Sequence, residues 1–153
     1  MAHAKERLEA EKPLYERDFH LWVGEQVRLL KEGRFERLDM DHLIDEVEEL
    51  ARNQKRSIRN DLVVLLTHLF KHQFQPDHRS SGRLGSINEH RRRIQEEIDD
   101  SPSLKRYPAS VLNACYEKAR QQAALETGLP ISRFPPTSPY DADKTLDPGF
   151  FPD

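Results

Sequence analysis

The residues of this sequence that are best suited to chemistry are two histidines, His68 and His72, which stand one helical turn apart in a dense apolar stretch. This spacing places both imidazoles on one helix face, the arrangement that helical zinc sites use. A zinc protease motif would also need a glutamate directly after the first histidine, where this sequence has Leu69. We therefore expect no bound metal and no cofactor. We expect His68 to be buried and hydrogen-bonded, and His72 to lie nearer the surface.

A run of three arginines that contains Arg91 and Arg92 is the second candidate. It belongs to a basic segment, residues 52–93, which carries 10 Lys and Arg against 3 Asp and Glu. Clustered arginines can bind the phosphates of nucleic acid. No helix-turn-helix spacing, zinc finger or aromatic-studded sheet accompanies the run, and the sequence pI of 6.2 is low for a nucleic-acid-binding domain. Because residues 1–51 and 94–153 are acidic overall, pairing within the fold is the favoured interpretation.

Two further features have ordinary structural interpretations that we prefer. The acidic residues between Asp45 and Glu49 could hold a divalent ion, but the Glu-x-x-His repeat of helical di-metal sites is missing around them. We expect them to form a solvated helix face. Cys115 is the only cysteine, and its apolar neighbours indicate a buried, unreactive thiol. No phosphate-binding glycine loop or catalytic serine elbow occurs, so an enzymatic activity is neither identified nor favoured.

Helices must position these residues. Apolar side chains recur at helical spacing, and Gly33, Pro76, Pro102 and Gly128 mark the ends of the periodic segments. The expected helices cover residues 14–33, 40–75, 84–100 and 108–127, with a short fifth helix at 139–146 that Ser138 caps. The longest contains neither glycine nor proline, so we favour one continuous helix over two, with its polar middle as the place for a bend. One apolar stripe runs along it and is densest around Leu69, which predicts the centre of a bundle.

The final segment, residues 131–153, differs in composition because it holds five of the ten prolines together with several aromatic residues. Disordered tails are poor in aromatics, so we expect an ordered strap lying across the helices. No strand-like alternation is found. The sequence therefore predicts an all-α fold over residues 1–153, a single-domain helical bundle of about four main helices with one long central helix. Residues 14–130 would form the bundle core.

The order of several motifs along the chain is also informative. They are YERDFHLW at 15–22, KEGRFERLDMDHLIDEVEEL at 31–50, LLTHLFKHQFQP at 65–76, INEHRRRI at 87–94, DSPSL at 100–104, ETGLPISRFP at 126–135 and SPY at 138–140. In their content and order the chain resembles the bacterial family catalogued as domain of unknown function family twenty-nine. The resemblance implies an all-helical fold and no assigned activity, so it supplies no catalytic residues. The chain departs from the family pattern at His72, where an aromatic is usual, and at Ser138, where a cysteine is frequent.

Length and composition limit the functions that the chain can have. No apolar run reaches the ~20 residues that cross a bilayer, and no charged-then-apolar leader begins the sequence, so we expect a cytoplasmic protein without membrane contact. Our first hypothesis is a small helical interaction or accessory module, whose partner is an unidentified protein or a second copy. The less favoured alternative is a nucleic-acid-directed protein, including a nuclease, that uses residues 52–93. The candidate binding residues are His68, His72, Arg91 and Arg92.

Overall fold

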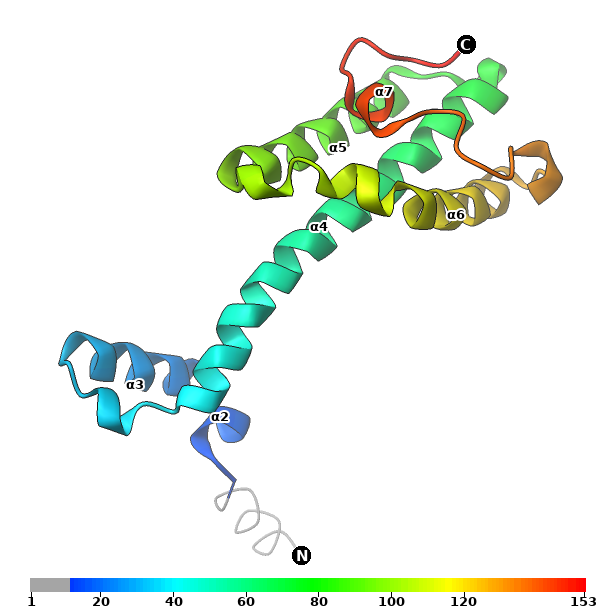
Figure 1. Ribbon diagram of the computed structural model, residues 1–153. Helices are drawn as coiled ribbons and strands as arrows, with labels where there is room; N and C mark the ends of the chain where they lie inside the picture. The colour runs from blue at the N-terminus through cyan, green and yellow to red at the C-terminus, as the bar shows by residue number, and fades with distance from the viewer. Residues whose placement is uncertain (1–11) are drawn as a thin grey trace, which may run out of the picture. The chain divides into compact units, whose positions relative to one another are not determined.

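The computed structural model describes residues 12–153, and this part of the chain contains helices and connecting turns but no strand (Figure 1). Its α-helices are α2 (Leu14–Arg17), α3 (Phe19–Lys31), α4 (Met40–Phe74), α5 (Ser81–Asp100), α6 (Tyr107–Thr127) and α7 (Ala142–Leu146). Its short 3-10 turns are η1 (Phe35–Arg37), η2 (Pro76–His78), η3 (Pro102–Leu104) and η4 (Ile131–Arg133). The expected all-α fold with a long central helix is confirmed. None of these helices is long and apolar enough to cross a bilayer.

Contacts along the chain fall into two compact units, and the division lies within α4, between Ala51 and Arg52. We refer to residues 12–51 as the N-terminal unit and to residues 52–153 as the C-terminal unit. α4 itself is one unbroken helix, as the absence of glycine and proline from its sequence favours. The single-domain organisation stays a prediction.

α3 begins and ends at signals that the sequence contains. The backbone of Asp18 is extended (φ −151°, ψ 89°), and its carboxylate accepts the N–H of Leu21 at 2.9 Å, so it caps α3 and separates it from α2. The single helix expected over residues 14–33 is therefore two helices. At the other end Gly33 has φ +69°, a left-handed conformation that suits glycine, and its N–H donates to the carbonyl of Leu30 at 3.1 Å.

Two later helices begin at positions that differ from the expected ones. α5 begins three residues earlier than the expected 84–100 helix, because the Ser80 hydroxyl accepts the backbone N–H of Arg83 at 3.2 Å. α7 begins after Asp141, whose carboxylate accepts an N–H of the first turn at 2.8 Å. Ser138, the expected cap, instead donates to a carbonyl two residues further on at 2.6 Å and so stabilises a tight turn.

Polar contacts fix the turn of the small N-terminal unit. Trp22 and Leu29 of α3 are its buried apolar side chains. Gln26, which lies one turn from each, is also buried, and its side-chain carbonyl accepts the backbone N–H of Asp39 at 2.8 Å. The Asp39 carboxylate in turn accepts the indole N–H of Trp22 at 3.0 Å. These two bonds hold the segment before α4 against the middle of α3.

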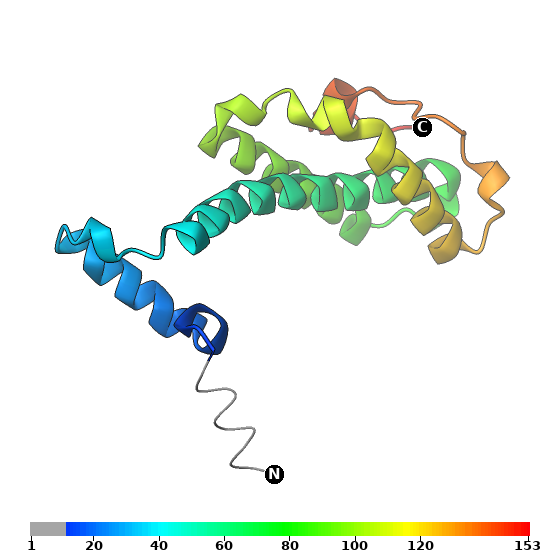
Figure 2. The ribbon, with the colours of Figure 1, turned by 60° about the horizontal axis from the view of Figure 1, so that its bottom comes forward.

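The C-terminal unit is built around the C-terminal half of α4, with α5, α6 and α7 gathered along it (Figures 1 and 2). Apolar side chains from all parts of the unit meet there. The core contains Ile58, Leu62, Leu65, Leu66, Leu69 and Phe70 of α4, Ile87, Ile94 and Ile98 of α5, Leu112, Cys115, Tyr116, Ala119 and Ala123 of α6, and Phe134 and Tyr140 of the tail. Elements far apart in the sequence thus form one continuous core.

The tail, residues 131–153, is the ordered strap that its aromatic content predicts. Phe134 and Tyr140 are buried in the core, and Phe150 is half-buried against it. The Tyr140 hydroxyl donates to the side-chain carbonyl of Gln73 on α4 at 2.5 Å. The strap is therefore fixed by both apolar and polar contacts with the helices.

The first three turns of α4 differ from the rest of the helix. The apolar stripe continues there through Met40, Ile44, Val47 and Leu50, yet all four side chains are exposed, with Val47 at 64% and Leu50 at 70%. The helical periodicity is the same in both halves of α4. A stripe of this kind indicates which face of a helix is apolar, but not whether anything covers it.

Replacing Leu69 with alanine should lower the free energy of unfolding by about 2–5 kcal/mol, because Leu69 is 0% exposed and the change leaves a cavity. Leu50→Ala on the same helix removes the same atoms from an exposed side chain, so it should cost under about 0.5 kcal/mol. Urea unfolding followed by circular dichroism measures both losses. Equal losses would contradict the division of α4 into a buried and an exposed half.

Candidate functional site

The four residues predicted from the sequence to bind a partner do not converge on one site. His68 and His72 lie one turn apart on α4, and Arg91 and Arg92 are neighbours on α5. Of the four, His72 and Arg91 come together at Phe151. The ring centroid of Phe151 is 5.8 Å from that of His72 and 5.3 Å from the guanidinium carbon of Arg91. The four residues occupy three separate environments.

Arg91 fastens the strap to α5. Its side chain is 4% exposed, and it donates from Nε to the carbonyl of Thr145 at 2.9 Å and from Nη2 to the carbonyl of Phe150 at 2.7 Å. Its Nη1 is buried and has no hydrogen-bond partner in residues 12–153. Burial lowers the pKa of this guanidinium, and the charge of Asp147 acts in the opposite direction. Because bonds from a charged donor are strong, Arg91 is well placed to act as a structural clamp.

His72 is the more buried of the two histidines, which reverses the expectation from the sequence. It lies beside Phe151 of the tail, and its Nδ1 has no hydrogen-bond partner within the described residues. Burial lowers the pKa of His72, and the charge of Arg79 lowers it further. The expectation from the sequence was wrong because the tail that covers His72 is distant from it in the sequence and leaves no signal in the helical period.

His68 is half-buried, lies near His90 of α5 and also lines a groove between α4 and α6. Its Nδ1 also lacks a hydrogen-bond partner in the part of the chain that the structure describes, so the expected hydrogen bond is absent at that nitrogen. Its ring lies nearly parallel to that of His90, at 19° and with 6.5 Å between the centroids. Burial lowers the pKa of His68, and the charge of Lys71 lowers it further. Both histidines of α4 therefore favour the neutral form.

A polar contact between α4 and α5 that sequence reasoning missed involves Asp61 and His90. Asp61 is buried, and its Oδ1 accepts a hydrogen bond from His90 Nδ1 at 2.7 Å. Arg93 Nη1 lies 3.9 Å from the same oxygen. Asp61 stands seven residues before His68, so the helical period places the two on one face. That signal marks Asp61 as a polar residue on the buried side, but nothing in the sequence identifies His90 as its partner.

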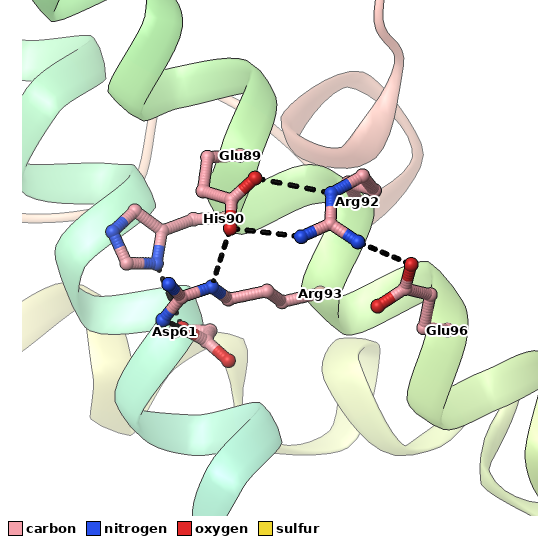
Figure 3. A network of polar contacts seen from close by, with 6 residues as sticks. All are labelled: Asp61, Glu89, His90, Arg92, Arg93 and Glu96. Carbon is pink, nitrogen blue, oxygen red and sulfur yellow. Dashed lines mark hydrogen bonds and ion pairs between the residues drawn. The ribbon is translucent and has the colours of Figure 1, made fainter.

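Figure 3 shows how the arginine run extends this network along α5. Glu89 accepts hydrogen bonds from Arg93 Nε at 2.9 Å and from Arg92 Nη2 at 2.9 Å. Arg92 also donates to Glu96 on its other side. Hydrogen bonds from Arg92 and then Arg93 lower the pKa of Glu89 to about 2. Arg92 is thus an exposed member of a series of ion pairs along a helix surface, a contact type of small energetic value.

This cluster lacks essential parts of a catalytic site. A carboxylate and histidine pair is the base of many nucleophilic sites, yet within residues 12–153 no hydroxyl or thiol hydrogen-bonds to His90. The described residues also include no group of three or more His, Cys, Asp or Glu side chains that could hold a metal ion. Cys115 is buried in the core, and burial raises the pKa of its thiol. The geometry favours a structural role for the Asp61 and His90 pair.

A different kind of site lies in the N-terminal unit. There α3 and the first turns of α4 form an apolar groove of about 270 Å³. We refer to it as the apolar groove. Its lining consists of Phe19, Trp22, Val23, Gln26, Val27 and Leu30 of α3, and of Leu43, Glu46, Val47 and Leu50 of α4. Most of its large apolar side chains are exposed. Adjacent exposed apolar side chains are a frequent feature of interaction surfaces.

Acidic residues border the apolar groove. Residues 40–51 of α4 include several Asp and Glu but no Lys or Arg. At about 100° per residue, Asp41 and Glu48 fall on one side of the apolar arc of α4, and Glu46 falls on the other. Glu46 also accepts a hydrogen bond from the Tyr15 hydroxyl at 2.6 Å. The groove therefore combines an apolar floor with a negative border. Sequence analysis identified an apolar stripe and an acidic face in this stretch, but not the groove.

Comparison with known families identifies the chain. A family whose sequence model is described as Domain of unknown function DUF29 matches residues 14–151. The chain belongs to this family. The match extends over both units, confirms the resemblance found from the motifs, and supplies no activity, because the function of DUF29 is unknown. No curated protein and no solved structure is significantly similar to the chain.

The lowered pKa values of His68 and His72 predict a loss of stability in mild acid. The unfolded chain binds a proton at each histidine near the ordinary pKa of 6.5, whereas the folded protein binds it only at lower pH. The contribution of these histidines to the free energy of unfolding should therefore be at its maximum above about pH 6.5. It should decrease as the pH falls below that value. His72→Phe removes one of the two groups and should make this fall smaller. Urea unfolding at several pH values between about 7.5 and 5.5 measures it.

His78→Phe is the control for this experiment, because His78 is exposed at the surface of the same unit. It should leave the pH dependence of unfolding unchanged. If His72→Phe gave the same pH dependence as the wild type, burial of a neutral His72 would not contribute to the pH dependence of unfolding. The account of this residue would then be wrong.

Arg91→Met should release the strap, because methionine fills similar space but cannot donate to the carbonyls of Thr145 and Phe150. Limited digestion with trypsin, followed by mass spectrometry, reports cleavage after Lys144 in α7. We expect this cleavage to be at least about tenfold faster in the variant, since two charge-assisted bonds are lost. Arg92→Met, on the exposed side of α5, should leave the rate unchanged. Equal rates in the two variants would show that Arg91 does not hold the strap.

Proposed function

We propose that the protein is a cytoplasmic interaction module that binds an amphipathic, basic helix of a partner protein in the apolar groove and has no catalytic activity of its own. The observation that carries this proposal is the exposure of large apolar side chains along one groove. They are Phe19, Val23, Val27, Leu30, Val47 and Leu50. Contiguous exposed apolar surface on a folded protein typically marks a site of interaction.

A helix suits the form of the apolar groove. The groove is bounded by two helices, and its apolar side chains recur along each of them at intervals of three and four residues. An incoming helix with apolar residues at the same intervals can place them between the two rows, which is a common mode of peptide recognition. Its apolar face would then cover side chains that otherwise contact water.

The charge around the apolar groove selects the kind of helix. The adjoining turns of α4 carry Asp41, Asp45, Glu46, Glu48 and Glu49 without a Lys or Arg among them. A partner helix with Lys or Arg beside its apolar stripe would complement this border, and like charges there would be repelled. A second copy of the chain would bring two such acidic stretches together. Charge therefore favours a basic partner over a homodimer formed through this groove.

Binding of nucleic acid by the basic segment is the alternative, and it has less support. Arg79, Arg83 and Arg91 donate to backbone carbonyls within the C-terminal unit. Arg92 and Arg93 are both paired with Glu89. Guanidinium groups that are engaged within the fold are less available to neutralise phosphates, which supply most of the affinity in such complexes.

A designed peptide provides a direct test of the proposal. The peptide is a helix of about 18 residues with leucines along one face and lysines on both sides of that face. Trp22 is the only tryptophan in the chain and lines the apolar groove, so its fluorescence reports occupancy. We expect a saturable change in this fluorescence, and binding at least about tenfold weaker when glutamates replace the lysines.

Two matched variants locate the binding. Val47→Asn lies in the apolar groove and should weaken binding of the lysine peptide about tenfold or more. Leu125→Asn makes a similar change at a side chain that is 80% exposed on α6, outside the groove, and should have no effect. Equal binding by wild type and Val47→Asn would overturn the proposal. So would a homodimer, detected by sedimentation, that Val47→Asn dissociates, because the occupant of the groove would then be a second copy.

A further inference from the structure

A second groove belongs to the C-terminal unit alone and lies between α4 and α6. Its volume is about 550 Å³, which falls within the roughly 300–1,000 Å³ of small-molecule sites. We call it the basic groove. The proposed interaction with a partner helix makes no use of it, so it needs its own explanation.

The floor of the basic groove is apolar. Val63 and Val64 of α4 contribute half-buried side chains, and Cys115 of α6 contributes a buried thiol. Burial raises the pKa of that thiol, so the sulfur stays protonated at neutral pH and acts as a small apolar surface. Such a floor suits the carbon skeleton or the flat ring of a ligand, and it is not a reactive centre.

The border of the basic groove is positively charged. Arg59 of α4 and Lys118 of α6 both line it, and both are close enough to act on the Cys115 thiol electrostatically. Arg59 Nη1 donates to the Tyr107 hydroxyl at 2.7 Å, a partner that leaves the guanidinium charge uncompensated. Neither Arg59 nor Lys118 forms an ion pair with any residue of the described range 12–153. Two cations from different helices thus border one apolar floor.

Glu126 is the acidic residue among the described residues that line this groove, and it does not cancel the charge of Arg59 and Lys118. Glu126 lines it but binds Lys71, with 2.8 Å between Oε2 and Nζ. The hydrogen bond from Lys71 lowers the pKa of Glu126, so the two form a neutral pair. His68, at the same groove, favours its neutral form because burial lowers its pKa. The charge of Arg59 and Lys118 is therefore left for a ligand.

We infer that the basic groove binds a small organic phosphate, with the phosphate between Arg59 and Lys118 and the body of the ligand on Val63 and Val64. A phosphate dianion in this groove is attracted by both cations, and hydrogen bonds between oppositely charged groups are stronger than those between neutral groups. An apolar or planar body adds burial that a bare anion lacks. Free nucleotides and the phosphorylated end of a nucleic acid strand share this chemistry.

Isothermal titration calorimetry with adenosine monophosphate tests the inference, using the full chain at about 50 mM salt, where exposed charges are weakly screened. We expect a dissociation constant below about 1 mM. Adenosine, which has the body without the phosphate, and inorganic phosphate, which has no body, should each bind at least about tenfold more weakly. A short single-stranded oligonucleotide with a 5′-phosphate is titrated as a further ligand. If it binds tighter than the mononucleotide, a strand end is the source of the phosphate.

The matched variants are Lys118→Gln and Lys144→Gln. Both residues are exposed lysines on helices of the C-terminal unit, and Lys118 lines the basic groove whereas Lys144 does not. Because Lys118 is exposed, its change should leave folding intact and weaken adenosine monophosphate binding about fivefold or more. Lys144→Gln should change nothing. The absence of binding at about 5 mM nucleotide, equal affinity for adenosine, or an unchanged Lys118→Gln variant would each overturn the inference.

Discussion

Burial of one face of α4, between Ile58 and Phe70, is the contact on which the whole C-terminal unit depends. α5, α6 and the tail each place their apolar side chains against it, so the helices share a single core. Polar groups complete the end of this helix, where the last carbonyls lack partners within the helix. Arg79 donates to the carbonyl of His72 at 2.9 Å, and Arg83 donates at 2.8 Å to that of Lys71, which also accepts the N–H of Gln75. Part of the basic segment therefore serves to finish the helix that the core requires.

The same helix continues into the N-terminal unit, where most of its apolar side chains are exposed. Because the C-terminal half of α4 supplies the burial that stabilises a fold, the apolar side chains near Val47 and Leu50 can remain exposed, as the proposed partner helix requires. The charge pattern follows this division. Residues 1–51 carry 8 Lys and Arg against 14 Asp and Glu, whereas residues 52–93 carry 10 against 3. The two proposed sites follow the same pattern, since the acidic unit holds the apolar groove for a basic helix and the basic unit holds the groove for an organic phosphate.

Much of the fold follows from local signals in the sequence, whereas the sites do not. Gly33 and Pro76 mark helix ends through backbone geometry that only nearby residues decide, and the ends of α3 and α4 fall beside them. The cover over His72 comes from a tail far away in the sequence, and the partner of Asp61 lies on another helix. Periodicity also cannot separate a covered apolar stripe from an exposed one, so neither groove could be predicted. Both depend on which helices lie side by side, and that is a property of tertiary packing.

The central claim is that one continuous helix has a buried, stabilising half and an exposed half that is available for binding. Native-state hydrogen exchange of the full chain, resolved along α4, tests this most directly. The account predicts that amides at residues 62–70 exchange only when the whole C-terminal unit unfolds. Amides at residues 43–50 should exchange at least about a hundredfold faster through local opening. Uniform protection from residue 43 to residue 70 would contradict the account, because the first turns of α4 would then be as firmly packed as the core.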